Sequence, residues 1–553
     1  MAWPSLTKKE SLIMPANFLF SLSIILISAC GISYQFLISR VLIQFSQDEV
    51  LNQSVTLGFY LLSMGLGAAL ADKLFLKDNR LKLYFIEITL ACVGILLVPL
   101  IYLFHVGINI FFFLANNALF YGNTAVFGLQ VFTVLIGFLT GFELPLLMAM
   151  AQENKASKFS DSRVLALSYL GALLGSLFSA GLLIPKIDFI SSGVLIGLFS
   201  LLAATILIVV AIDKIKKMIL LFILIPFAMA LAIIQWAPKI EQLFLKDYYV
   251  NIKVPQTSIQ NIETMLKFFS SLESVERYIT NYQIIDMTPD QFMDKYDQDT
   301  GFVVYLNNQV QFGRKNYEMY HETMVHGSIN VAHKIPQNVL ILGGGDGLIL
   351  SELLKLDDVK SITQVELDPQ MIELATYHPV LRELNQAAYS KERVHLIYED
   401  GFHYVRTTKD KFDAIFIDFP FPTSYDLSKL YSLEFYRSLR KSMTEKAFFV
   451  FDAPVVIQSD LVEALPHPSP QDIILSTLNA AHFNSIYAFG LTESFYVVSA
   501  TDQPLKIDYE TLPKWLKNQT IANLSVLNHA LTSAEISKNY VNSIFKPQKF
   551  IFK

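Results

Sequence analysis

Seven long apolar runs in the first 237 residues constrain this chain more than any other feature of its sequence. A helix needs about 20 residues to cross the hydrocarbon core of a membrane. Each run has roughly that length, which predicts an all-α transmembrane helix bundle of about seven helices over residues 1–237, in contact with a lipid bilayer. The runs lie at 16–39, 54–72, 83–104, 124–150, 164–184, 189–212 and 218–236.

The sequence after residue 237 is typical of a water-soluble protein, with charges and turn residues throughout. We divide it into a linker and small β-rich lid (238–335), a Rossmann-like nucleoside-binding catalytic domain (336–500) and a C-terminal tail (501–553). The formal charge of −6 and the lack of a polybasic tail argue against nucleic acid as a partner. Both cysteines lie in apolar runs, so no Cys-based metal site is expected.

The basic residues of the short loops predict how the bundle is oriented. They cluster before the first run and after the second, fourth and sixth runs. This asymmetry places the N-terminus in the cytoplasm of a multi-pass inner-membrane protein and, with seven spans, the C-terminal half outside. The apolar segment 111–121 is too short to span and is interpreted as a re-entrant or interfacial piece. If it were an eighth helix, the C-terminal half would return to the cytoplasm.

Glu143 is the one acidic residue that we single out within the apolar runs. A carboxylate inside a membrane is costly and usually pairs or lines a cavity. Pro145 lies two residues further on, which favours a broken helix with a polar membrane site at this point. The alternative, that Glu143 reaches headgroup water at the end of its span, stays open.

A nucleoside-binding pattern begins at residue 339. The apolar run 339–342 is followed by the turn Gly343-Gly344-Gly345-Asp346-Gly347, and a second predicted strand ends at Glu366, 19 residues after Gly347. A glycine-rich turn between strand and helix lets a nucleoside approach the backbone, and a carboxylate about 20 residues later can bind the ribose hydroxyls. The alternation of buried strands and helices predicts a doubly wound α/β sheet.

Acidic residues follow two further predicted strands. The strand 393–398 leads to Glu399, Asp400 and Gly401, and the strand 412–417 leads to Asp418. Open α/β sheets bind ligands at the carboxyl ends of their strands, so Asp400 is placed to accept a hydrogen bond from an adenine amino group. Asp418 is placed toward the reacting end of the ligand. For either carboxylate, a simple helix N-cap is the alternative.

These motifs resemble the spermidine synthase (polyamine aminopropyltransferase) family, in its membrane-bound bacterial type with an N-terminal seven-span domain. The resemblance covers roughly residues 275–500. It rests on the glycine-rich turn and on the segments 365–368, 399–401, 430–436, 282–283, 306–311 and 320–322, together with Asp418 and its prolines.

The resemblance implies a transferase that moves the aminopropyl group of decarboxylated S-adenosylmethionine to an amine and releases methylthioadenosine, without a metal. It implies that Asp418 is the base and that Asp346 holds the aminopropyl amine. It implies further that Tyr320 borders the acceptor channel and that the chain forms a homodimer. The remaining nucleoside-binding residues that it implies are Gln283, His321, Gly343, Gly345, Gly347, Glu366, Glu399, Asp400 and Gly401.

The chain departs from the family on the acceptor side. Phe421 stands where the family has a second acid. Neutral residues stand at 307–308 and 316–317, where the family pattern has further acidic residues. Losing a carboxylate that pairs with a buried ammonium costs several kcal/mol. Two alternatives therefore remain. One is cyclisation, lyase chemistry or methyl transfer on S-adenosylmethionine itself, and the other is a transporter or sensor with a regulatory nucleoside-binding domain.

Two further points concern metals and topology. His321 and His326 are five residues apart, about 140° around a helix, so they cannot share a metal on one face.

S-adenosylmethionine is made in the cytoplasm, whereas the charge asymmetry places the C-terminal half outside. The side of the catalytic domain therefore stays open.

Overall fold

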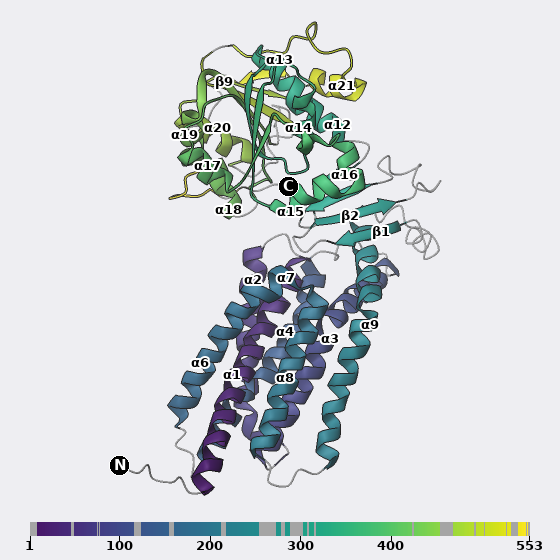
Figure 1. Cartoon of the computed structure of the whole chain (residues 1–553), viewed down its shortest axis with the longest axis vertical. Helices are drawn as coiled ribbons and strands as arrows, with labels where there is room; N and C mark the ends of the chain where they lie inside the picture. The colour runs from purple at the N-terminus through teal and green to yellow at the C-terminus, as the bar shows by residue number, and fades with distance from the viewer. Residues whose placement is uncertain are drawn as a thin grey trace. The chain divides into compact units, whose positions relative to one another are not determined.

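The chain divides into two compact units in a computed structural model: Met1–Phe292 with Val304–Val310, and Met293–Val303 with Gln311–Lys553. Figure 1 shows both units, which are described separately below. The structure describes residues 8–45, 49–74, 76, 78–114, 123–153, 160–211, 217–253, 272–277, 282–287, 302–306, 309–313, 317–422, 425–453, 468–490, 494–502, 504–526, 528–531, 540–548 and 550.

The first unit is a bundle of long helices (Figure 1). Helix α1 packs against α2, α6 and α8, while α3 packs against α8, α9, α4 and α5. The helices are α1 (Lys8–Ile43), α2 (Glu49–Ala69), α3 (Asn79–Leu114), α4 (Asn123–Gly141), α5 (Glu143–Glu153), α6 (Asp161–Phe178), α7 (Ile184–Lys186), α8 (Phe189–Ala211) and α9 (Lys217–Lys253). Helix α9 continues beyond residue 237, where the sequence analysis placed the start of a linker.

Six segments of the described part are long and apolar enough to cross a membrane, rather than the seven expected. They are Asn17–Ile43, Asn79–Ile108, Gly128–Glu153, Asp161–Lys186, Phe189–Leu207 and Phe222–Leu245. The expected second span corresponds to α2, which is helical but carries Asn52, Gln53 and Ser63 among its apolar residues. Part of the expected interfacial piece, Phe111 to Leu114, belongs to α3, and its remainder lies outside the described residues.

The fourth predicted span is broken, as the position of Pro145 suggested. Helix α4 ends at Gly141, Phe142 is a turn residue and α5 begins at Glu143. Gly141 is also a point of close helix contact, because a Cβ there would lie 2.1 Å from the carbonyl oxygen of Met64 in α2. Only glycine allows the two backbones to approach this closely.

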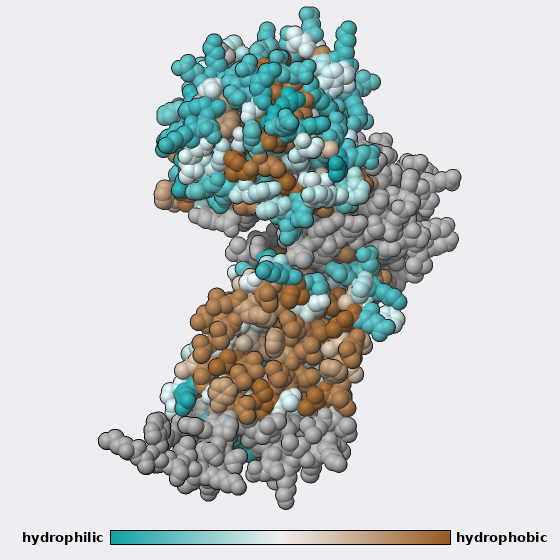
Figure 2. Space-filling view, in the orientation of Figure 1, coloured by the Kyte–Doolittle hydropathy of each residue, from teal (hydrophilic) through white to brown (hydrophobic). Residues whose placement is uncertain are grey.

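The surface of the helical unit carries an apolar belt. Figure 2 shows a nearly continuous hydrophobic band over this unit, in contrast to the mixed surface of the other. Large apolar patches of this kind mark contact with lipid or protein. The exposed side chains include Leu61, Leu62 and Leu66 of α2, Leu170, Leu173, Leu174 and Leu177 of α6, and Leu224, Phe227, Leu231 and Trp236 of α9.

A small sheet follows the bundle in sequence, in the strand order β1-β2-β3-β4. Its strands are β1 (Leu272–Arg277), β2 (Tyr282–Met287), β3 (Val303–Leu306) and β4 (Gln309–Gly313). Strands β1 and β2 pair antiparallel. A β-rich segment before the catalytic domain was expected from the sequence.

The second unit is built on an eight-stranded sheet in the order β12-β10-β11-β9-β8-β5-β6-β7. Strands β5 to β9 run parallel, and β10, β11 and β12 extend the sheet antiparallel. The strands are β5 (Asn338–Gly343), β6 (Ser361–Glu366), β7 (Val394–Tyr398), β8 (Phe412–Asp418), β9 (Met443–Asp452), β10 (Ile486–Phe489), β11 (Phe495–Ser499) and β12 (Asn528–Leu531).

Helices cover both faces of this sheet, as a doubly wound fold requires. Successive residues of β5 enter two separate cores, with Leu340 and Leu342 in one and Val339 and Ile341 in the other. The helices are α12 (Tyr317–Glu322), α13 (Ser328–Ala332), α14 (Leu348–Leu354), α15 (Pro369–Tyr377), α16 (Pro379–Leu384), α17 (Gly401–Thr407), α18 (Tyr425–Ser428), α19 (Leu433–Lys441), α20 (Pro470–Ala480) and α21 (Asn518–Val526). A π-helical turn, Thr323–Gly327, joins α12 to α13.

The segment 501–553, interpreted from sequence as a tail, is part of this fold. Strand β12 pairs with β10 and forms one edge of the sheet. Further on, the buried amide of Asn542 donates hydrogen bonds to the carbonyl oxygens of Ser428 (2.8 Å) and Tyr431 (3.1 Å). These contacts tie the segment to the end of α18 and to the 3-10 turn that follows it.

Candidate active site

The order of the central strands brings the predicted site residues to one edge of the sheet. Strand β5 lies between β8 and β6, with Gly343 opposite Asp418 and Leu342 opposite Val365. The glycine-rich turn, Asp418 and Glu366 therefore follow three neighbouring strands at their carboxyl ends. This is the edge at which open α/β sheets bind ligands.

The glycine-rich turn is shaped by a close approach to β8. Gly343 has a φ of +81°, and a Cβ there would lie 2.2 Å from the carbonyl oxygen of Asp418. The positive φ and the lack of space for a Cβ exclude any residue larger than glycine at position 343.

Side chains that the sequence analysis did not single out hold this turn. The amide of Gln364 donates to the carbonyl oxygens of Gly343 (3.0 Å) and Gly344 (2.7 Å), and the hydroxyl of Tyr389 donates to that of Gly345 (2.8 Å). Gln364 is fully buried in the middle of β6, and a polar residue inside an apolar strand was the signal that could have revealed it.

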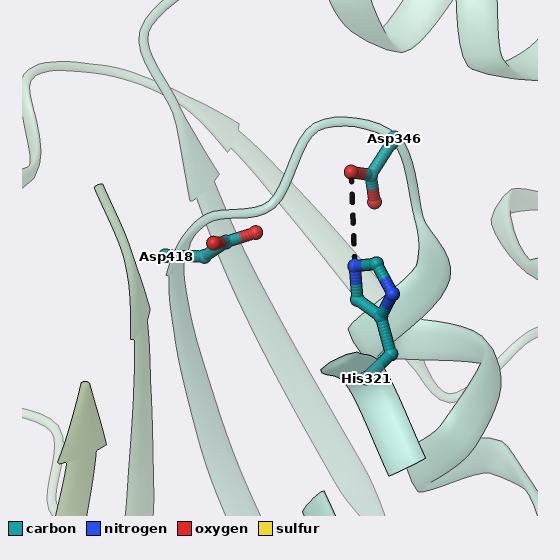
Figure 3. Close-up of side chains that lie close together, drawn as sticks. All are labelled: His321, Asp346 and Asp418. Carbon is teal, nitrogen blue, oxygen red and sulfur yellow. Dashed lines mark ion pairs between the residues drawn. The ribbon is translucent and has the colours of Figure 1, made fainter. Parts of the chain in front are cut away.

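Asp346 and His321 face each other across the site (Figure 3). Asp346 Oδ1 accepts a 2.8 Å hydrogen bond from the backbone N–H of Leu348, in the first turn of α14. Its Oδ2 lies 4.0 Å from His321 Nε2. The other ring nitrogen of His321 contacts the carbonyl oxygen of Tyr317, which fixes the ring on α12.

Asp418 completes this group of three side chains. Its Oδ1 accepts a 2.9 Å hydrogen bond from the hydroxyl of Tyr320. One ligand atom each of His321, Asp346 and Asp418 lies within 4.8 Å of the others, a spacing that could hold a cation. The structure thus brings together four of the predicted site residues, Tyr320, His321, Asp346 and Asp418.

Burial changes the acidity of this group. Burial raises the pKa of Asp346 to about 6. Burial, together with the neighbouring charge of Asp346, raises the pKa of Asp418 to about 6. Burial also lowers the pKa of His321, so its ring is neutral at neutral pH. Two carboxylates with little compensating charge form a site that favours a positively charged ligand.

Glu366 lies on the other side of the glycine-rich turn. A Cβ on Gly345 would lie 2.8 Å from Glu366 Oε2, so Gly345 leaves room for this carboxylate. Glu366 Oε1 accepts a hydrogen bond from the backbone N–H of Asp368 at 3.0 Å. Burial raises the pKa of Glu366 to about 7.

Asp400 is the N-cap of α17, which is the simple alternative considered from the sequence. Its Oδ1 accepts from the backbone N–H of His403 (3.0 Å), and its Oδ2 pairs with Lys429 (2.9 Å). Burial alone would raise the pKa of Asp400, but these two partners outweigh it and lower the pKa. Glu399 pairs with His403, and Gly401 is the first residue of α17. An adenine contact at Asp400 stays a prediction.

Two other predictions concern Gln283 and the histidine pair. Gln283 lies in β2, opposite Arg277, and its side chain is outside the described part of the structure. His326 does not join His321, because its Nε2 binds Glu352 at 3.0 Å. The two histidines therefore serve different partners, as their spacing indicated.

Asp452 was missed in the sequence analysis. It ends β9 and follows Phe451, which pairs with Ile417 of β8, so Asp452 and Asp418 lie at neighbouring positions of the same sheet edge. The charges of both carboxylates act on the buried phenol of Tyr431. The available signal was an acid directly after the apolar run 447–451.

Known proteins are similar to this chain over most of its length. A sequence model of the spermine/spermidine synthase domain matches residues 317–464. The polyamine aminopropyltransferase of Leptospira interrogans is 30% identical over 426 residues, covering 77% of this chain and 76% of the relative. Polyamine aminopropyltransferase 2 of Aquifex aeolicus is 31% identical over 425 residues, covering 76% of each chain.

The chain belongs to the polyamine aminopropyltransferase family. The expected resemblance and the expected enzyme class, a transferase, are both confirmed. An alignment of 426 residues is longer than everything after residue 237, so these aminopropyltransferases match part of the helical unit as well. Among solved structures, spermidine synthase from Thermotoga maritima is 24% identical with a TM-score of 0.35, covering 46% of this chain and 85% of the synthase.

Proposed function

We propose that this chain transfers the aminopropyl group of decarboxylated S-adenosylmethionine to an amine and releases methylthioadenosine. The observation that carries the proposal is the placement of Asp346 and Asp418 at the same edge of the sheet, with the neutral His321 beside them. Family membership supports the same reaction. In this proposal, Asp346 pairs with the ammonium of the aminopropyl group, Glu366 binds the ribose and Asp400 lies toward the adenine.

The chemistry requires a base that is ionised before the amine attacks. An alkyl amine has a pKa near 10.4, so about one in 10³ is neutral at pH 7. The amine nitrogen forms a bond to the methylene carbon beside the sulfonium as the carbon–sulfur bond breaks, and sulfur keeps the electron pair. Asp418 accepts the proton that the nitrogen loses. With a pKa of about 6, this carboxyl is mostly ionised at neutral pH.

The acceptor side retains an acid despite the departures from the family pattern. Phe421 is 37% exposed and cannot pair with an ammonium. Asp452, next to Asp418 on the sheet edge, is placed to do so. This carboxylate favours transfer to a separate amine over a reaction within the donor. The change Asp452→Asn is expected to raise KM for the amine more than it lowers kcat.

The test uses purified full-length protein with decarboxylated S-adenosylmethionine and a panel of amines, and follows methylthioadenosine by mass spectrometry. We expect an amine-dependent signal that Asp418→Asn abolishes and that Asp410→Asn, a change at an exposed position, leaves intact. Amine-independent methylthioadenosine would instead support cyclisation or lyase chemistry. No product from either form of the donor would favour a binding role without turnover.

We also propose that the helical unit crosses a membrane. The proposal is supported by six apolar segments among its described residues, by its exposed apolar belt and by the match of relatives to part of this unit. The side on which the catalytic unit lies depends on α2, because a seventh span would place the two termini on opposite sides. Labelling of an introduced Lys506→Cys with a membrane-impermeant maleimide, in sealed spheroplasts and in inverted vesicles, distinguishes the two topologies.

A further inference from the structure

Two carboxyl groups lie together inside the helical unit. Glu87 is on α3 and is 0% exposed, and Glu143 is the first residue of α5 and is 7% exposed. Helices α3 and α5 pack against each other, and each carboxyl group acts electrostatically on the other. The sequence analysis singled out Glu143, whereas its partner Glu87 emerges only from the fold.

The protein provides little to balance this pair. Within the described part of the chain, no N–H or O–H group donates to either carboxyl oxygen of Glu87. The nearby hydroxyls are used elsewhere: that of Tyr60 donates to the carbonyl oxygen of Gly31 (2.8 Å), and that of Thr140 donates to the carbonyl oxygen of Gly137 (3.0 Å).

The titratable groups that interact with the pair are also neutral or acidic. Among the described residues they are Cys30 and Tyr34 on α1 and Tyr60 on α2. From α8, the hydroxyl of Ser200 contacts Tyr34 rather than either carboxyl. No Lys, Arg or His of the described residues acts on the pair.

Two facing carboxylates cannot both remain ionised in such surroundings. Moving one unpaired charge out of water costs several kcal/mol, and a second like charge beside it adds to that cost. The pair is stable only when something supplies a positive charge. Buried acids of this kind inside helical bundles mark ion or proton sites.

The break between α4 and α5 lies at the same place. Phe142 interrupts the helix directly before Glu143, and the carboxyl of Glu143 would lie 3.6 Å from a Cβ on Gly31 of α1. Discontinuous helices in the core of a bundle line ion and substrate sites in many membrane proteins. The pair is thus surrounded by α1, α2, α3 and the α4–α5 break.

We propose that Glu87 and Glu143 form a cation-binding site in the helical unit, which takes up one positive charge per chain. In the compact arrangement described here that charge is a proton, and the primary ammonium group of an amine replaces it when it binds. The ammonium part of this inference rests on the proposed function. The proton part does not.

The first measurement is infrared difference spectroscopy of the full-length protein in liposomes, which detects protonated carboxyl groups. At a pH of about 9 the carboxyls of the catalytic unit, with pKa values of about 6 to 7, are ionised. We expect one protonated carboxyl per chain to remain. It should disappear in the double variant Glu87→Gln/Glu143→Gln and persist in Glu153→Gln, a matched change at the exposed end of α5.

The second measurement adds putrescine to the same liposomes. Release of one proton per bound amine, with loss of the carboxyl signal, identifies the ammonium as the exchanging cation. A carboxyl signal that putrescine leaves unchanged limits the site to the proton and overturns the ammonium part. Sodium chloride at matched ionic strength controls for a non-specific effect of salt.

The proposal is overturned if the wild-type protein has no protonated carboxyl and binds no putrescine outside the catalytic site. Both results come from protein with Glu87 and Glu143 intact, so they hold even if the glutamine variants do not fold. Binding outside that site is measured with saturating methylthioadenosine in the Asp418→Asn/Asp452→Asn background. Because these readouts need no turnover, they remain valid if the proposed aminopropyl transfer fails. Methylthioadenosine production by Glu153→Gln reports that reaction separately.

Discussion

The hydroxyl of Tyr320 donates a 2.9 Å hydrogen bond to Oδ1 of Asp418, which joins helix α12 to the end of strand β8. The bond stabilises the ionised carboxylate and opposes the effect of burial on its pKa. It also orients one oxygen of Asp418 and leaves the other available for the amine of the proposed reaction.

We expect Tyr320→Phe to lower kcat by about 10-fold. A hydrogen bond to a charged group is worth roughly 1.5 kcal/mol, which corresponds to a factor of about 10 in rate. Without the donor, the pKa of Asp418 rises further, so the acid limb of the pH profile moves to higher pH. Tyr377→Phe, at an exposed position, serves as the control. An unshifted acid limb in Tyr320→Phe would show that the phenol does not act on Asp418.

The pH dependence of the wild-type enzyme follows from the two central acids. The proposed reaction requires Asp418 and Asp346 to be ionised, and the pKa of each lies at about 6. At saturating amine, kcat/KM for the sulfonium donor is therefore expected to fall as the pH drops through about 6. Initial rates across this range measure it. A profile that stays flat to about pH 4 would contradict the assigned roles.

Asp346 is expected to destabilise the unliganded protein at neutral pH. Its folded pKa, about 6, lies above the ordinary value of 3.8, so the folded state loses stability as the pH rises between these values. Asp346→Asn keeps an oxygen that can accept from Leu348 but removes the charge. We expect a gain of about 1–3 kcal/mol at pH 8, with loss of activity.

Thermal unfolding of unliganded protein at about pH 4 and pH 8 tests this expectation. The gain should be present at the higher pH and absent at the lower one, where the wild-type carboxyl is already protonated. A gain of equal size at both values would point to a packing effect instead.

Gly343→Ala is expected to disable the site. The added Cβ would lie 2.2 Å from the carbonyl oxygen of Asp418, and the φ of +81° is strained for alanine. We expect a loss of at least about 2 kcal/mol of stability and of most donor binding. Gly65→Ala, in α2 with open space around its Cα, is the matched control and should unfold at the wild-type temperature or above. Unchanged donor binding by Gly343→Ala would refute the argument.

The apolar belt provides a test of membrane insertion. Leu173→Arg places a charge on the exposed face of α6, where it would meet lipid at a cost of about 2.5–3.5 kcal/mol. We expect less protein in the carbonate-resistant membrane fraction. Ile335→Arg, on the surface of the catalytic unit, should have no such effect. Equal recovery of both variants would argue that the belt does not contact lipid.

The sequence predicted the features of this protein that depend on neighbouring residues. The strand before Gly343, the strand end at Glu366 and the helix break beside Glu143 each follow from a short local pattern, and the structure contains all three. Strand order placed Asp418 beside Gly343, and the sequence indicated that only through a general rule for α/β folds.

Contacts between distant segments could not be predicted in this way. Glu87 could be recognised as the partner of Glu143 only from the packing of α3 against α5. Asp452 could be placed beside Asp418 only from the pairing of β9 with β8. Gln364 was overlooked because its partners, the carbonyl oxygens of Gly343 and Gly344, have no sequence signature. Six apolar segments rather than seven meet the length and hydropathy of a span among the described residues, because α2 carries the polar residues Asn52, Gln53 and Ser63.

The position of β12 has a consequence for biosynthesis. This strand forms the edge of the sheet next to β10, yet it follows every other described strand in sequence. During translation the helices α1 to α9 emerge first, and the sheet cannot be completed until residues 528–531 have left the ribosome. The helical unit is therefore synthesised before the sheet can be completed, and a ribosome that stalls before β12 leaves β10 with an open edge prone to aggregation.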